Sequence, residues 1–252
     1  MTIRAVLFDF YGTLARATKW FSADEVLAEH GYALTDAHRA IYYADGLDGV
    51  EHDEHSQSRD HYVAWQRERT LAMLAASDVH PDEHEIIIEK LHAGAATRQL
   101  DPYDEVAPVL AELRARNIGI VICSNWDWDL REAVEEARLT DAVDAMVSSA
   151  WIGARKPHPR IFVAALEEAG VPPEHTLFVG DTWGPDVGGP LNAGITPLYL
   201  QRDGHWDDAT APADLGDVAV APDLTGVLDN LGERQRADDA GTPARRRAAP
   251  AP

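Results

Sequence analysis

Short apolar runs alternate with amphipathic stretches over the second half of the chain. From Asp101 onward, stretches with apolar residues at helical spacing are separated by short runs rich in Val, Ile and Leu. This alternation predicts a parallel sheet covered by helices on both faces, an α/β fold. The predicted strands are 118–123, 145–148, 176–179, 196–200 and 217–221, and the predicted helices are 106–116, 129–138, 159–170, 187–193 and 224–231.

The first hundred residues have a different pattern. Residues 3–8 form an apolar, β-branched run that predicts a buried strand ending at Asp9. Residues 16–98 then show apolar residues at helical spacing, and this block predicts helices with no strand. The predicted helices are 21–30, 36–46, 58–76 and one opened by Pro81, and the block is interpreted as a helical insert.

The end of the chain has no apolar periodicity. Residues 232–252 are rich in Arg, Ala, Asp and Pro, and this composition predicts a disordered tail. The predicted organisation is therefore a core from residues 1–15 and 99–231, an insert from 16–98, and a tail from 232–252.

Composition narrows the classes of partner. Hydrophobic residues make up 45% of the chain and charged residues 26%, which is typical of a soluble globular protein. No apolar run reaches the roughly 20 residues of a membrane span, and no secretory leader precedes the first strand, so we expect a cytoplasmic protein. A formal net charge of −21 disfavours nucleic acid and anionic membranes. The expected partner is a small molecule bound by a monomer or homodimer.

The only cysteine lies within an apolar run. Cys123 ends the predicted strand 118–123, so it is expected to be a buried small hydrophobic residue. A disulfide within the chain is impossible with one cysteine.

Chemically useful side chains follow the predicted strands. Asp9 follows the first strand and precedes the turn Gly12-Thr13, where glycine allows close approach of a ligand and the amides near Phe10 and Tyr11 can face an anion. A carboxylate held there can act as a nucleophile. An ordinary turn-capping aspartate would have the same local sequence.

Three later segments carry further candidates. Ser124 and Asn125 follow the next strand and can hydrogen-bond a transferred group, although a helix N-cap is the commoner role of such a pair. Lys156-Pro157 precedes a predicted helix. Asp181 and Asp186 follow strand 176–179, and with Asp9 they are oxygen ligands suited to Mg²⁺.

The order of these four segments resembles the haloacid dehalogenase (HAD) superfamily. The motifs are Phe8-Asp9-Phe10-Tyr11-Gly12-Thr13, Ser124-Asn125, Lys156-Pro157 and Gly180-Asp181 with Asp186. The resemblance implies a Rossmann-like parallel sheet with a helical cap of the family's first class inserted after the first motif. It implies that Asp9, Ser124 and Lys156 are catalytic, that Phe10, Tyr11, Thr13 and Asn125 bind substrate, and that Asp9, the Tyr11 carbonyl, Asp181 and Asp186 bind Mg²⁺.

One position departs from the phosphatases of this family. Many of them carry a second aspartate two residues after the nucleophile as a general acid, and this chain has Tyr11 there. A phenol with a pKa of about 10 donates a proton poorly at neutral pH. This front segment is similar to metal-free 2-haloacid dehalogenases, whereas Asp181 with Asp186 is similar to Mg²⁺-dependent phosphatases. We favour a phosphatase, with a dehalogenase or a catalytically weak binding protein as alternatives.

The insert and the turns supply candidates for a substrate pocket. Trp126, Trp128 and Trp183 lie on the turns beside Ser124 and Asp181 and are candidates for an aromatic rim or for core packing. The run His52-Asp53-Glu54-His55 is interpreted as a charged loop rather than a metal site. The candidates within the insert are Trp20, Arg39, Tyr42, Tyr43 and Trp65.

Overall fold

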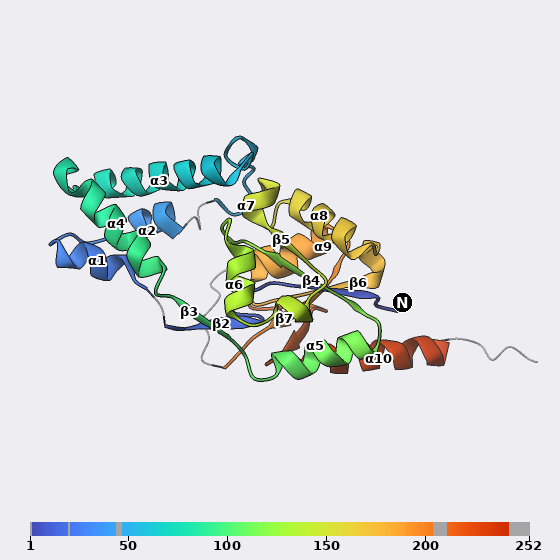
Figure 1. Cartoon of the computed structure of the whole chain (residues 1–252). Helices are drawn as coiled ribbons and strands as arrows, with labels where there is room; N and C mark the ends of the chain where they lie inside the picture. The colour runs from blue at the N-terminus through green and yellow to red at the C-terminus, as the bar shows by residue number, and fades with distance from the viewer. Residues whose placement is uncertain (1, 20, 44–46, 204–210, 242–252) are drawn as a thin grey trace, which may run out of the picture.

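A six-stranded parallel sheet forms the centre of the computed structural model (Figure 1). The structure describes residues 2–19, 21–43, 47–203 and 211–241. The strand order is β5-β4-β1-β6-β7-β8, which confirms the predicted α/β, Rossmann-like fold. The strands are β1 (Ala5–Phe8), β4 (Gly119–Ser124), β5 (Ala145–Ser148), β6 (Thr176–Gly180), β7 (Thr196–Leu200) and β8 (Ala219–Ala221).

Helices cover both faces of this sheet. Successive side chains of each strand point to opposite faces, and both faces are apolar, so both must be covered. Val6, Phe8 and Ile122 face one cluster, and Leu7 and Val121 face another. The first cluster includes residues of α5 (Val106–Ala115), α6 (Leu130–Glu136) and α10 (Thr225–Gly241); the second includes residues of α8 (Pro159–Ala169). Figure 1 shows α5 and α10 below the sheet and α8 above it.

The insert has its own apolar cluster. The helices of the insert are α1 (Ala23–Glu29), α2 (Asp36–Tyr43), α3 (Arg59–Ala76) and α4 (His84–Ala95). Leu27, Met73 and Ile87 are among the buried residues that pack together here. In α3 the Ser58 hydroxyl caps the first turn by accepting a hydrogen bond from the His61 amide.

Two expectations about element boundaries are wrong. Residues 16–98 were expected to contain no strand, yet β2 (Ala15–Lys19) pairs antiparallel with β3 (Gln99–Pro102) at the two ends of the insert. The chain after Leu231 continues as helix α10 to Gly241 instead of ending in a disordered tail. Residues 242–252 of the predicted tail lie outside the described residues.

Short helical elements follow two of the strands. After β5 the chain turns at once into α7 (Ser149–Ile152), and after β6 a π-helical turn (Trp183–Gly188) runs into α9 (Gly189–Asn192) where the sequence predicted one helix.

Cys123 is fully buried, as expected, and burial raises its thiol pKa to about 12. Within the described part of the chain, no helix is long and apolar enough to cross a membrane.

Candidate active site

The sheet brings Asp9, Ser124 and Lys156 together although they are far apart in sequence. Asp9 directly follows β1, and Ser124 is the last residue of the neighbouring β4. The carboxyl ends of adjacent parallel strands meet at one edge of the sheet. Asp9 Oδ1 accepts hydrogen bonds from Ser124 Oγ at 2.9 Å and from Lys156 Nζ at 2.7 Å. Two of the predicted catalytic residues, Ser124 and Lys156, therefore contact the third, Asp9, directly.

Lys156 lies between two carboxylates. Its side chain is only 1% exposed, and Nζ also donates to Asp186 Oδ1 at 2.6 Å. Burial alone would lower the pKa of this ammonium, but Asp186 and Asp9 outweigh burial and raise the pKa above its usual value. Lys156 therefore remains a cation throughout the physiological pH range.

Asp9, Asp181 and Asp186 form a compact acidic group. One oxygen from each carboxylate lies within 4.8 Å of the others, and all three residues are buried. Burial raises the pKa of Asp186 to about 8; Lys156 opposes this shift, and Asp9 and Asp181 add to it. Lys156 pairs with two of these three carboxylates, Asp9 and Asp186, and a divalent cation among the three would offset their remaining repulsion. The donor set fits Mg²⁺, which prefers hard oxygen ligands.

Two glycines let the backbone approach these carboxylates. Gly12 has φ +83°, and a Cβ built on it would lie 2.3 Å from Asp181 Oδ2. A Cβ on Gly180 would lie 2.4 Å from Asp186 Cγ. Thr13 Oγ1 donates to Asp181 Oδ1 at 3.2 Å, and the Thr182 amide donates to Asp186 Oδ2 at 3.0 Å. The loops that carry the acids are therefore packed tightly around them.

Gly12→Ala is expected to reduce both stability and activity. A left-handed alanine costs about 1–2 kcal/mol, and a crowded side chain adds about 1–3 kcal/mol. Gly31 is a matched control, because its φ is +82° but nothing lies within 4 Å of a Cβ there. Urea unfolding of the two variants separates strain from crowding. Equal losses of stability with full activity in Gly12→Ala would contradict the importance of the contact with Asp181.

The comparisons with known proteins agree with this geometry. Residues 3–194 match the family model of haloacid dehalogenase-like hydrolases. The chain belongs to this family. It is 34% identical to a phosphoserine phosphatase of Thermus thermophilus over 47% of this chain and 48% of that protein. It is 31% identical to an (S)-2-haloacid dehalogenase of Xanthobacter autotrophicus over 79% of this chain and 76% of the other.

A solved structure supports the fold assignment. The HAD phosphatase from Thermococcus onnurineus superposes with a TM-score of 0.55 at 22% identity, covering 91% of this chain and 98% of that chain. This HAD-like hydrolase therefore has relatives among both phosphatases and dehalogenases.

Asn125 lies beside the site but is already engaged by protein groups. Its Oδ1 accepts from the Lys156 amide at 2.7 Å, and its Nδ2 donates to the Lys156 carbonyl and to Asp48 Oδ1, both at 3.0 Å. The predicted contact with substrate stays a prediction. The observed hydrogen bonds hold the backbone of Lys156 in place.

Phe10 and Tyr11 surround Trp126. Phe10 is fully buried and meets the Trp126 ring edge-on at 5.2 Å, so only its backbone is a candidate for substrate binding. Tyr11 is half-buried, with its ring centroid 6.4 Å from that of Trp126. Burial raises the Tyr11 pKa, the Ala17 backbone opposes the rise, and Asp181 adds to it. The phenol is thus protonated, and a weak acid, at neutral pH.

The other predicted pocket residues lie in different surroundings. Arg39 forms ion pairs with Asp24 and Asp36 inside the insert. Trp128 packs against Tyr62, and Trp183 packs edge-on against Tyr199. Trp20 and the side chains of Tyr42 and Tyr43 lie outside the described residues.

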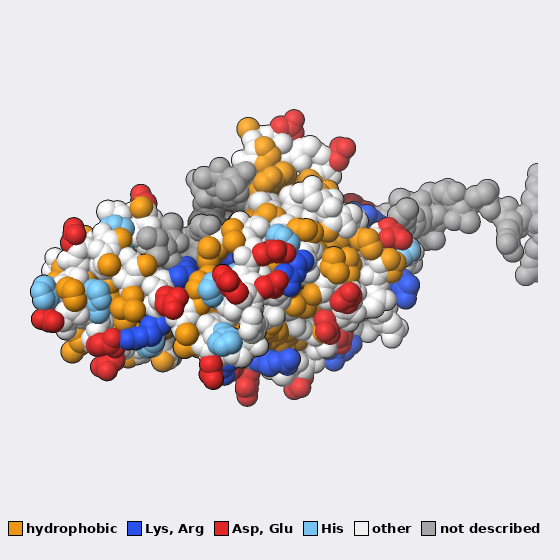
Figure 2. Space-filling view, turned by 90° about the horizontal axis from the view of Figure 1, so that it is seen from above, with side chains coloured by type: hydrophobic (Ala, Val, Ile, Leu, Met, Phe, Trp, Pro, Cys, Tyr) orange, Lys and Arg blue, Asp and Glu red, His pale blue; other side chains and the backbone are white. Residues whose placement is uncertain are grey.

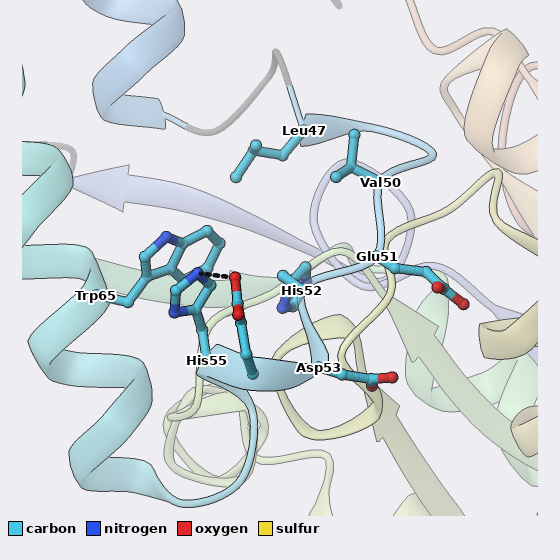
Figure 3. A pocket seen from close by; sticks show the side chains of 8 residues that line it. Leu47, Val50, Glu51, His52, Asp53, His55 and Trp65 are labelled. Carbon is cyan, nitrogen blue, oxygen red and sulfur yellow. Dashed lines mark ion pairs between the residues drawn. The ribbon is translucent and has the colours of Figure 1, made fainter.

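Trp65 lines a cavity of about 460 Å³ in the insert (Figure 3). Its ring stacks on His55 at 4.6 Å, and His55 Nε2 lies 3.4 Å from Glu54. Burial, with Arg155 nearby, lowers the His52 pKa to about 4. In the described part of the chain, Asp9, Asp181 and Asp186 are the only group of three or more His, Cys, Asp or Glu side chains placed to hold a metal ion.

The sequence did not identify Arg202 as a candidate. This buried guanidinium donates to the carbonyls of Gly12 at 3.1 Å and Thr13 at 2.8 Å, and to Glu105 at 2.6 Å. It also lies 3.7 Å from the centroid of the Tyr103 ring. Arg202 therefore fixes the loop that follows Asp9. Its only sequence signal was a basic residue two positions after strand 196–200.

Proposed function

We propose that this HAD-like hydrolase is a Mg²⁺-dependent phosphatase of small phosphorylated metabolites, with Asp9 as its nucleophile. The observation that carries the proposal is the buried group of Asp9, Asp181 and Asp186, in which Lys156 pairs with Asp9 and Asp186. A third buried carboxylate beside Asp9 and Asp186 adds to the negative charge removed from water, and a divalent cation among the three would offset that cost.

The side chains have distinct roles in this proposal. Among the described residues, Ser124 and Lys156 both donate hydrogen bonds to Asp9 Oδ1, so Asp9 Oδ2 is the oxygen expected to attack phosphorus. The new bond joins Oδ2 to phosphorus, while the bond to the leaving alkoxide breaks and its electron pair stays on that oxygen. Water then hydrolyses the aspartyl phosphate and restores Asp9.

The surrounding groups stabilise negative charge during this transfer. Lys156 and Ser124 donate hydrogen bonds beside the reacting carboxylate, and Asp181 and Asp186 would hold the ion with Asp9. Bound Mg²⁺ would supply Lewis-acid stabilisation of the phosphoryl oxygens. We propose that the insert acts as a cap over this edge of the sheet. Because Tyr11 is a weak acid, the expected substrates have leaving groups that need little protonation, or draw their proton from a group other than Tyr11.

The second candidate is a 2-haloacid dehalogenase. Tyr11 supports it, because halide needs no proton when it leaves, and the similarity to the Xanthobacter autotrophicus dehalogenase is extensive. In that reaction Asp9 would attack carbon, and Lys156 would be the main balancing charge.

Metal removal separates the two candidates. Metal-free protein should hydrolyse p-nitrophenyl phosphate at a rate lower by on the order of 10²-fold or more, because the stabilisation of developing charge is lost. Added Mg²⁺ should restore that activity. The measurements are release of nitrophenol and of chloride from 2-chloropropionate, with EDTA and then with Mg²⁺. Chloride release in EDTA without phosphatase activity would reject the phosphatase, and silence on broad panels of both substrates would favour a binding protein.

A further inference from the structure

Asp48, an acidic residue of the insert, contacts two side chains beside Lys156, those of Asn125 and Arg155. Asp48 Oδ1 accepts a hydrogen bond from Asn125 Nδ2 at 3.0 Å and another from Arg155 Nε at 3.1 Å. Arg155 is buried and directly precedes Lys156. The Asp48 carboxylate thus joins the turn after β4 to the turn that carries Lys156.

Asn125 extends this connection to the Lys156 backbone. It binds both the amide and the carbonyl of Lys156, and the Gly49 amide donates to the same carbonyl at 3.2 Å. The side chain that leaves this fixed backbone contacts Asp9 and Asp186 through Nζ. A shift of the Lys156 backbone would therefore move Nζ away from one or both carboxylates.

The neighbouring part of the insert is also docked on the core. The Arg155 amide donates to the Val50 carbonyl, and Glu51 forms an isolated bridge with Ala154. Arg160 pairs with Asp53 at 2.5 Å and with Glu51 at 3.3 Å. Figure 2 shows acidic and basic side chains intermingled on the upper face of the molecule, as expected of a surface held by such pairs.

We propose that Asp48 is a positioning residue that couples docking of the insert, through Asn125, to the placement of Lys156. The inference rests on the proposed function, because it takes Lys156 as a catalytic group. Asp48 supports the Lys156 backbone through Asn125 and pairs with Arg155, so it need not contact substrate. When residues 47–50 leave the core, Asn125 loses one partner, and Arg155 becomes a buried cation without its carboxylate.

Asp53 provides a matched control. It belongs to the same segment and also pairs with a core arginine, but that partner is the partly exposed Arg160 in the first turn of α8 and not Arg155. Asp48→Ala should lower kcat about 10–100-fold with little change in KM, because misplaced catalytic groups slow the chemical step. Asp53→Ala should stay within about 2-fold of wild type, because exposed ion pairs contribute little.

A conservative variant separates positioning from folding. Asp48→Asn keeps a carbonyl oxygen that can accept from Asn125 and Arg155, so kcat should recover to within about 5-fold of wild type. The measurements are Mg²⁺-dependent kinetics on p-nitrophenyl phosphate and thermal melting for wild type and the three variants. Equal kcat values for Asp48→Ala and Asp53→Ala would overturn the inference. It would also be overturned if Asp48→Ala changed KM without lowering kcat, or if Asp48→Asn lowered kcat as much as Asp48→Ala does. A wild-type protein without phosphatase activity would instead refute the proposed function.

Discussion

Asp9→Asn is expected to lower kcat on the order of 10⁴-fold or more while the protein stays folded. The amide cannot become esterified, but its Oδ1 can still accept the hydrogen bonds that Ser124 and Lys156 now donate. The substitution also removes the charge of one of three clustered carboxylates, so metal-free stability should not fall sharply. Steady-state kinetics and circular-dichroism melting test both parts of this expectation.

A covalent trap makes the same prediction specific to one residue. Rapid acid quenching of wild-type turnover should leave a phosphate-sized mass increase on the peptide that contains Asp9, and the Asp9→Asn variant should show none. Asp36→Asn is a suitable control, because Asp36 is an exposed carboxylate on α2 that pairs with Arg39. Substantial turnover by folded Asp9→Asn would contradict the assignment of the nucleophile under either candidate chemistry.

The core strands and long helices were predictable because local patterns determine them. The run 196–200 matches β7 and 145–148 matches β5, since both are short apolar runs bounded by polar turns. Helical spacing likewise located α3. In a parallel sheet the ends of such strands share an edge, which is why Asp9, Ser124 and Asp181 could be grouped from sequence alone.

Elements without an apolar face were not predictable in this way. In β2, Arg16, Thr18 and Lys19 give no strand signal, and pairing with β3 depends on residues about eighty positions away. The sequence of α10 after Leu231 lacks apolar periodicity, and Leu231 is the last of its described residues in the buried apolar cluster. Propensity and helix continuation extend such a segment without leaving a mark in the pattern.

The positioning residues escaped prediction for a related reason. Arg202 lies 190 positions from Gly12, and Asp48 lies 77 positions from Asn125. Their charges look like ordinary surface charges until the fold brings backbone carbonyls and amides to them. Conversely, Arg39 looked like a pocket residue but its charge is satisfied inside the insert. Sequence therefore indicated the proposed catalytic groups better than the groups that hold them.

Lys156→Met is expected to abolish activity and to destabilise the fold. The methionine fills similar space but leaves Asp9 and Asp186 without the ammonium that now lies 2.7 Å and 2.6 Å away. Breaking a buried ion pair by removing one partner costs about 3–5 kcal/mol. Lys90→Met is the control, because Lys90 forms a partly exposed pair with Glu29, and its loss should stay within about 0.5 kcal/mol.

The loss of stability should depend on pH in a defined direction. The raised pKa of Lys156 means that its contribution is fully present below about pH 10, so the wild type keeps it throughout the neutral range. Asp186 has a raised pKa and retains its proton more readily when folded, so folding is opposed as pH rises from about 4 to about 8. Without Lys156 the pKa of Asp186 rises further, so this opposition continues above pH 8. Urea unfolding in EDTA should therefore show a larger deficit for Lys156→Met above pH 8 than at pH 5.

Mg²⁺ provides a further test of the same charges. If the three carboxylates hold the ion in the folded state, saturating Mg²⁺ should stabilise Lys156→Met by mass action and recover part of its deficit above pH 8. Activity should not return, because the ion does not replace the hydrogen bond from Nζ to Asp9. A deficit that is independent of both pH and Mg²⁺ would mean that it does not arise from the charge of Lys156, and that outcome would remove the electrostatic basis of the proposed site.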